Sequence, residues 1–293
     1  MKRVVFGHSV RGAAHIRSGT ECQDSYMQTI CDDGTIILSV ADGHGSKACP
    51  YSRTGAEIAV NVFCSIIKAI FDGYAEHPEQ LVTYLNREGE ICISQSIDMK
   101  WKKCIVETHM KNNREIPALE DGSDDLKSVY NQYGTTLLGL ALTKTFVFAL
   151  QLGDGDICHV NPSGLELVIE PEKVLGVETH SLSSEDAWKK VNTIVHRFDL
   201  EADLPVMFTL SSDGFANSYK SESEFHYTVL DYFKMINEYG AKTVEENLPS
   251  WLSETSSMGC GDDITLLIAH FSRDEEDRTS ERELSEAEKD IVE

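Results

Sequence analysis

Three aspartates stand where apolar runs meet glycine turns. Asp42 and Asp213 each end an apolar run and precede a glycine, whereas Asp262 lies between Gly261 and the apolar run 264–269. A carboxylate at a buried strand end costs free energy unless it is paired or coordinated. Three such ends, far apart in sequence, predict one shared cationic centre. Ligand sets made only of oxygen suit a hard cation such as Mg²⁺ or Mn²⁺.

The bulk composition is that of a globular protein with an unusual charge. The 293 residues are 41% hydrophobic and 26% charged, and the formal net charge is -23. A chain of this length can bury a sizeable core in one large domain or two small ones. The strong negative charge argues against binding to nucleic acid or to an anionic membrane, because both need basic surface. A site for phosphate would therefore need its own metal charge.

Cysteine spacing and apolar runs indicate the compartment. The eight cysteines form no CxxC pair, so a zinc ribbon or a redox pair has little support. The first residues hold too short an apolar run for a signal peptide, and no stretch approaches the roughly 20 apolar residues of a membrane span. We therefore expect a cytoplasmic monomer that binds neither membrane nor nucleic acid.

The pattern of apolar runs and turns predicts many short strands between helices. Strands are expected at residues 4–6, 25–31, 35–40, 135–143, 146–152, 156–160, 165–169, 193–198, 206–210 and 264–269. Helices are expected at residues 52–71, 80–110 (as one helix or two), 222–238 and 243–255. Hairpin-linked strands with helices before and after them favour an α+β domain of antiparallel sheets covered by helices.

The composition changes after Phe271. Residues 272–293 hold ten acidic and four basic side chains and few apolar ones. Such a segment buries too little apolar surface to fold alone. We therefore expect one domain over residues 1–271 and a disordered acidic tail over residues 272–293, with a regulatory or docking role for the tail as the alternative.

A series of short motifs in a fixed order resembles the type 2C metal-dependent Ser/Thr protein phosphatases. The motifs are Gly7-His8-Ser9, Gln23-Asp24-Ser25, Ala41-Asp42-Gly43-His44-Gly45, Gly134-Thr135-Thr136, Gly153-Asp154-Gly155, Ser212-Asp213-Gly214 and Gly261-Asp262-Asp263-Ile264-Thr265. Each fragment alone is weak, because Asp-Gly is a common turn. Their order over about residues 7–271 is specific. The resemblance implies a four-layer α-β-β-α sandwich of two antiparallel sheets flanked by helices, with metals in a cleft at one edge of the sheets.

The resemblance also implies a ligand set and a reaction. Asp42 would bridge two Mn²⁺ or Mg²⁺ ions, with the carbonyl of Gly43 on the second ion. Asp213 and Asp262 would complete the first ion, and Asp24 would hold metal-bound water. In such a family a water bridging the two ions attacks phosphorus in line, and hydrolyses phosphoserine or phosphothreonine in a protein substrate.

A histidine follows the bridging aspartate. By the same resemblance His44 would act with Asp42 in catalysis and protonate the departing serine or threonine alkoxide. Asp154, in contrast, is interpreted as a cap of its own Gly-Asp-Gly turn. The family's flap would correspond to residues 176–190, which is a short version.

Two positions depart from the family pattern. The arginine that clamps phosphate is replaced by His15 in the alignment, and Arg11 or Arg17 could supply the guanidinium from a shifted position. In the family a separate aspartate binds a third metal ion. The nearest match to it here is Asn131, with Asp124 and Asp125 further upstream, so the resemblance leaves open whether a third ion binds in addition to the two.

Two other functions compete with the protein phosphatase. The first is a non-catalytic domain of this type that binds a partner and has lost its metals, but such a protein is expected to lose a ligand aspartate and none of the three is lost. The second is a phosphatase that acts on small phosphoesters, which the His15 substitution and the short flap keep open.

Overall fold

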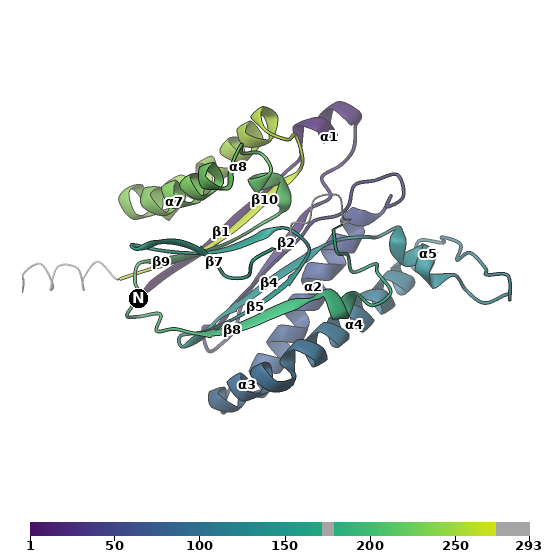
Figure 1. Ribbon diagram of the computed structural model, residues 1–293, viewed down its shortest axis with the longest axis horizontal. Coiled ribbons are helices and arrows are strands. Elements are labelled where there is room, and N and C mark those ends of the chain that lie inside the picture. The colour runs from purple at the N-terminus through teal and green to yellow at the C-terminus, as the bar shows by residue number, and fades with distance from the viewer. Residues whose placement is uncertain (172–178, 274–293) are drawn as a thin grey trace, which may run out of the picture.

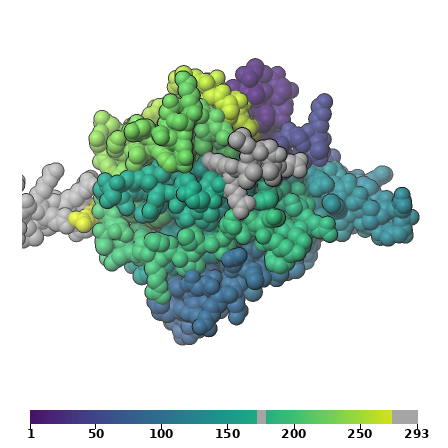
Figure 2. All heavy atoms as spheres, viewed as in Figure 1, coloured from purple at the N-terminus to yellow at the C-terminus, as the bar shows by residue number. Residues whose placement is uncertain are grey.

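A computed structural model describes residues 1–171 and 179–273, and the predicted acidic tail lies outside these residues except for Ser272 and Arg273. Two five-stranded antiparallel sheets stack face to face, and helices cover both outer faces (Figure 1). The space-filling view shows the helices around residues 75–110 on one outer face and those around 222–258 on the other (Figure 2). The predicted α-β-β-α sandwich is confirmed.

Both sheets are built from neighbours that run antiparallel. The first sheet has the order β1 (Lys2–Val10), β10 (Ile264–Ser272), β9 (Val206–Ser211), β6 (Asp156–Asn161) and β7 (Gly164–Leu167). The second has the order β2 (Ser25–Ile30), β3 (Ile36–Ala41), β4 (Leu137–Leu142), β5 (Phe146–Leu152) and β8 (Asn192–Arg197). The first sheet therefore places β1, near the start of the chain, beside β10, near its end.

Helices form the outer layers, and further short helical segments lie near the strand ends. The first sheet is covered by α7 (Glu222–Tyr239) and α8 (Ala241–Met258), and the second by α2 (Ser52–Gly73), α3 (Pro78–Tyr84) and α4 (Glu90–Lys111), the last two joined by a π-helical turn at Leu85–Gly89 (Figure 1). The short helices are α1 (Ala13–Ser18), α5 (Leu126–Asn131), α6 (Asp213–Ala216) and a 3₁₀ turn at Ala187–Lys190.

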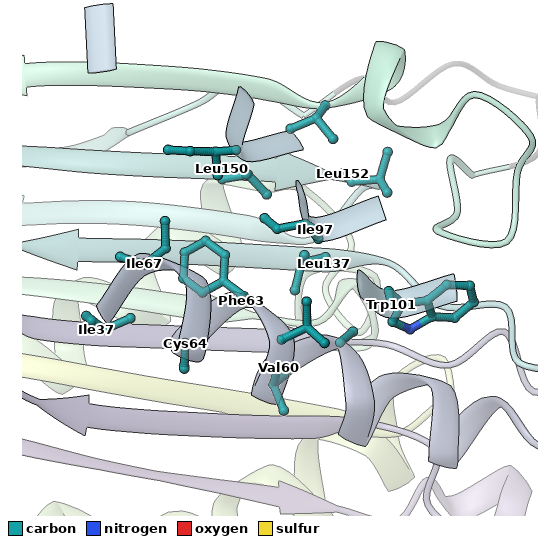
Figure 3. Close-up of a cluster of buried hydrophobic side chains, with 14 of the residues drawn as sticks. Ile37, Val60, Phe63, Cys64, Ile67, Ile97, Trp101, Leu137, Leu150 and Leu152 are labelled. Atoms are coloured by element: carbon teal, nitrogen blue, oxygen red, sulfur yellow. The ribbon is translucent and has the colours of Figure 1, made fainter. Parts of the chain in front are cut away.

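Three apolar clusters hold these layers together, one between the sheets and one under each helical layer. The cluster under α2 is drawn in Figure 3, where Phe63 lies among aliphatic side chains of α2 and the second sheet and Trp101 lies to one side. A Cβ on Gly139 of β4 would collide with the Phe63 ring, so the glycine permits the helix to pack this closely. The Trp101 indole N–H donates to the Gly55 carbonyl at 3.0 Å, which satisfies its one buried polar group.

Helix α2 corrects one sequence expectation. Its 22 residues are long and apolar enough to cross a membrane by length and composition, although the sequence was expected to hold no such stretch. Half of the apolar window is buried within the fold, and the helix contributes ten buried residues to the core. Its hydropathy is therefore that of a core helix, because a buried helix can be as long and as apolar as a membrane span.

The strand registers bring the motif aspartates to one end of the sandwich. Val10 at the end of β1 pairs with Ile264 at the start of β10, and Ser211 at the end of β9 pairs with Leu266. In the second sheet Ser25 at the start of β2 pairs with Ala41 at the end of β3. The residues that adjoin these termini therefore share one edge, and α1 lies at the same end of the molecule (Figure 1).

Candidate metal centre and active site

Carboxylates from four separate segments face one another at this edge. Burial raises the pKa of Asp42 well above its ordinary value, and the charges of Asp24, Asp213 and Asp262 raise it further. Burial also raises the pKa of Asp213, with Asp154 and Asp262 as charged neighbours. Asp42 and Asp213 each contribute to the shift in the other's pKa, so the two carboxyl groups interact directly. The cluster thus holds more negative charge than it can stabilise alone.

Asp24 is held by hydroxyl groups from the other sheet. Its side chain is only 7% exposed, and its Oδ2 accepts from Ser212 Oγ at 2.7 Å and from Thr265 Oγ1 at 2.8 Å. Thr265 Oγ1 lies 2.6 Å from Ser9 Oγ on β1. Asp24 Oδ1 is buried and has no hydrogen-bond partner among the described residues. Burial, with a contribution from the charge of Asp263, raises the pKa of Asp24 to about 7.

The main chain of Asp42 is fixed by the Gly-Thr-Thr motif. The Asp42 carbonyl accepts from Thr135 Oγ1 and from the Thr136 N–H, both at 2.8 Å, while its own N–H donates to Thr136 Oγ1 at 3.0 Å. Thr135 also forms a β-bridge with Gly43. These contacts explain the two hydroxyl residues of the motif, because both of their side chains and the Thr136 N–H form hydrogen bonds with the backbone of Asp42.

Gly43 and Gln23 pack tightly beside that peptide. A Cβ on Gly43 would lie 2.8 Å from the Gln23 carbonyl oxygen and 2.9 Å from Ser52, so no other residue fits there without displacing backbone. Gln23 is 6% exposed, and its Oε1 finds no hydrogen-bond partner in residues 1–171 and 179–273. Among the described residues around the acidic cluster, Gln23 Oε1 is therefore a second buried oxygen, besides Asp24 Oδ1, that lacks a donor.

Asp213 and Asp154 come from different segments of the chain and have separate partners. Asp213 begins α6, and its Oδ2 accepts from Asn217 Nδ2 at 2.9 Å. Asp154 was expected to cap its own turn, but its Oδ2 accepts from Thr179 Oγ1 at 2.8 Å. Because its charge raises the pKa of Asp213, Asp154 belongs to the same electrostatic cluster.

The three residues predicted to bind phosphate lie in or before α1, and His15 is the one that contacts the described acidic residues of the cluster. His15 Nδ1 lies 2.8 Å from Asp263 Oδ1, outside hydrogen-bond geometry, and His15 Nε2 lies 3.8 Å from Asp262 Oδ1. Arg11 Nη2 donates to the His15 carbonyl at 3.0 Å, which ties this guanidinium to the backbone of α1. Arg17 is exposed near Gly261.

Asp263 links separate segments of the site through hydrogen bonds to their backbone. Its side chain is 3% exposed, and it accepts from the Gly12 N–H at 2.6 Å and from the Gln23 N–H at 2.7 Å. It therefore joins the start of β10 to the segment that enters α1 and to the segment that precedes β2. Asp262, in contrast, has a side chain that is 52% exposed, and it lies at the rim of the cluster.

The His44 side chain lines a pocket beside the acidic cluster. Its N–H donates to the Gly134 carbonyl at 3.1 Å, and a Cβ on Gly134 would lie 2.6 Å from His44 Cδ2. The ring lines a cavity of about 540 Å³ together with residues of the 179–184 segment. The part of the predicted flap before Thr179 falls outside the described residues.

The donor set fits a hard divalent cation. Within the described residues, no three acidic, histidine or cysteine side chains already stand at ligand distances from a common point. Asp24 Oδ2 accepts from two hydroxyls, and Asp262 Oδ1 accepts from the Asp263 N–H at 2.9 Å, so some rotation would accompany binding. Two buried oxygens without donors and a set of mutually repelling carboxylates are, however, what a bound Mg²⁺ or Mn²⁺ would satisfy.

Sequence reasoning missed the hydroxyl residues that orient the carboxylates. Ser212 and Thr265 both donate to Asp24, although neither was named as a site residue. Each lies within three residues of a predicted metal ligand, which was the available signal. The partner of those hydroxyls was unpredictable, because Asp24 belongs to the other sheet.

Comparisons with known proteins agree with this architecture. The sequence profile described as protein phosphatase 2C matches residues 11–253. No curated protein matches the chain significantly by sequence. Similar solved structures include the catalytic domain of the serine/threonine protein phosphatase PstP in complex with two manganese ions, at 13% identity and a TM-score of 0.57, covering 92% of this chain and 99% of that one.

Two further structures show the same fold. The serine/threonine phosphatase of S. agalactiae is 14% identical with a TM-score of 0.58, covering 93% of this chain and 100% of that one. The phosphatase Stp1 from Staphylococcus aureus is 12% identical with a TM-score of 0.61, covering 93% and 96%. At these identities the structures establish the fold, while the profile match spans most of the sequence. The chain belongs to the protein phosphatase 2C family.

Proposed function

We propose that this protein is an active, divalent-metal-dependent phosphatase that hydrolyses phosphoserine and phosphothreonine in proteins. The observation that carries the proposal is the acidic cluster at one sandwich edge, where Asp24 retains a buried oxygen without a donor among the described residues. Family membership supports metal-dependent phosphoester hydrolysis, and the related PstP structure contains two manganese ions.

The residues divide into those that hold the cations and those that position them. Asp42, the Gly43 carbonyl, Asp213, Asp262 and Asp24 are the proposed ligands, with Asp24 acting through water. Bound divalent cations lower the pKa of water and offset the charge that develops on phosphoryl oxygens. The hydroxyls on Asp24 and the Gly-Thr-Thr contacts to Asp42 keep these groups in place, which limits reorganisation during the reaction.

Two histidines have proposed roles toward the substrate. His44 lies two residues after the proposed ligand Asp42 and lines a cavity, which supports a role as the acid that protonates the leaving alkoxide. His15 lies beside Asp262, so it is the proposed first contact for the phosphoryl group, with Arg11 and Arg17 as further cations on the same segment.

The wider setting is also a proposal. A phosphorylated protein is the proposed partner, and the net charge of -23 supports the absence of nucleic-acid and anionic-membrane binding. We propose a monomer in the cytoplasm with a role in signalling, supported by the lack of paired cysteine spacings.

A comparison of three substrates tests the function against its alternatives. Turnover of a phosphothreonine peptide, p-nitrophenyl phosphate and glycerol phosphate is measured with Mn²⁺ and with EDTA, with Asp42→Asn as the inactive control. We expect Mn²⁺-dependent turnover of the peptide. Turnover of glycerol phosphate without the peptide would favour a small-molecule phosphatase. Absence of turnover for all three, in protein shown to bind Mn²⁺, would favour a non-catalytic partner-binding domain.

A further inference from the structure

A cavity of about 540 Å³ opens directly beside His44. The cavity is lined by Ser46, Ala48 and Cys49 of the segment that follows Asp42, by the 179–184 segment, and by Asn131 at the end of α5. Its volume is in the range of ligand sites, which is about 300–1,000 Å³. A group bound here would lie next to the phosphoryl group that the proposed acid serves.

The lining of this cavity is polar but uncharged. Of the described residues that line it, none is acidic or basic apart from the histidine, and the others offer hydroxyl, thiol, amide and methyl groups. This composition is unusual for a chain with 26% charged residues and a net charge of -23. The neighbouring Lys47 and Glu185 are exposed and are not among the lining residues.

The 179–184 segment of the lining is hydrogen-bonded to Thr135, which contacts the backbone of Asp42. Ser181 Oγ accepts from the Thr135 N–H at 3.1 Å, and the Leu182 N–H donates to the Thr135 carbonyl at 3.0 Å. Ser183 Oγ lies 3.0 Å from Ser181 Oγ. Because Thr135 also donates to the Asp42 carbonyl, this segment is preorganised with respect to the site of chemistry.

We propose that this cavity is a specificity subsite, which accepts a neutral hydrogen-bonding side chain (Ser, Thr, Asn or Gln) close in sequence to the phosphoresidue of a protein substrate. The proposal rests on the proposed phosphatase function. Hydroxyl and amide groups can exchange hydrogen bonds with such a side chain. A lysine, arginine, aspartate or glutamate would be desolvated without a charged partner among the described lining residues, which costs free energy.

The test is a phosphothreonine peptide panel in which each position from two before to two after the phosphothreonine carries Asn, Ala, Lys or Glu. With the full chain and saturating Mn²⁺, one of these positions should favour Asn over both Lys and Glu by about tenfold in kcat/KM, as expected for one unpaired charge or lost hydrogen bond.

Charge variants of the lining then identify the cavity as the origin of the preference. Ala48 is exposed and lines the cavity, so Ala48→Glu should raise the relative kcat/KM of the Lys peptide at that position, and Ala48→Lys that of the Glu peptide. The matched controls are Ala202→Glu and Ala202→Lys, at an exposed site on the β8–β9 connection at the opposite end of the strands, which should keep the parent preference.

Each outcome decides one of the two claims. Equal kcat/KM across the panel, or Ala48 variants that behave like the Ala202 controls, would overturn the subsite while leaving the phosphatase function intact. Failure to hydrolyse any peptide with Mn²⁺ bound would overturn the proposed function, and the subsite with it.

Discussion

Replacing Asp24 with asparagine should stabilise the metal-free protein at alkaline pH. The pKa of Asp24 is raised from 3.8 to about 7, chiefly by burial. At about 1.4 kcal/mol for each tenfold change in acid dissociation, this is at most about 4 kcal/mol of destabilisation of the ionised form in the folded state. Asparagine keeps an oxygen for the Ser212 and Thr265 hydroxyls and removes the charge, so it avoids that cost.

The sign of the pH dependence follows from linkage. A carboxyl group whose pKa is higher in the folded state than in the unfolded state destabilises the fold fully above pH 7 and not at all below about pH 4. The stability difference between Asp24→Asn and the parent should therefore grow from near zero at pH 4 to a few kcal/mol at pH 8. Urea unfolding in EDTA measures it at each pH.

The matched control is Asp262→Asn, the same substitution at a side chain that is 52% exposed, where little change in the free energy of unfolding is expected. Adding Mn²⁺ should then reverse the order, because the parent gains binding free energy that the variant loses in part. A stability gain that is equal at pH 4 and pH 8, or a loss at pH 8, would refute the account of Asp24 as a strained buried carboxylate.

Three further predictions follow from single contacts. Asp213→Asn should abolish turnover at saturating Mn²⁺ while leaving the fold as stable or slightly more stable, since it relieves repulsion in the cluster; retention of most of the parent kcat would exclude Asp213 as a ligand. His44→Ala should slow a phosphothreonine peptide by about 10²–10⁴-fold and p-nitrophenyl phosphate much less, because a phenolate leaves without a proton, and equal losses would remove His44 as the acid. Gly55→Ala should destabilise the fold by several kcal/mol, because its Cβ would collide with the Tyr133 carbonyl, whereas Gly73→Ala in the same helix, with open space around it, should be neutral or stabilising; similar Tm values for the two variants would contradict the packing.

The strands and helices were predictable where local pattern and packing agree. The run 206–210 became β9 at Val206–Ser211, and the helix expected at 222–238 became α7 at Glu222–Tyr239. The first strand was expected at 4–6 but extends over Lys2–Val10, because its flanking residues gain their order from pairing with β10 at the other end of the chain. Such pairing has no local signal.

The position of the acidic cluster was predictable from motif order, but its internal contacts were not. The family resemblance indicated that Asp42 and Asp213 share one edge. The contact of His15 with Asp263 and the hydrogen bond from Thr179 to Asp154 depend on side-chain directions at the edge of the sheets, which sequence spacing does not specify. The roles of the predicted ligands and of the phosphate-binding residues remain predictions for the measurements above.

The central claim is that the acidic cluster works by holding divalent cations. The most direct measurement is the hydrolysis of a phosphothreonine peptide by metal-depleted protein, with metal content determined by elemental analysis, as Mn²⁺ is added back. Because the inferred ligands are carboxylate and carbonyl oxygens, turnover should be absent in excess EDTA and should rise with bound Mn²⁺ toward two ions per chain. Undiminished turnover by protein shown to contain no metal would contradict the claim.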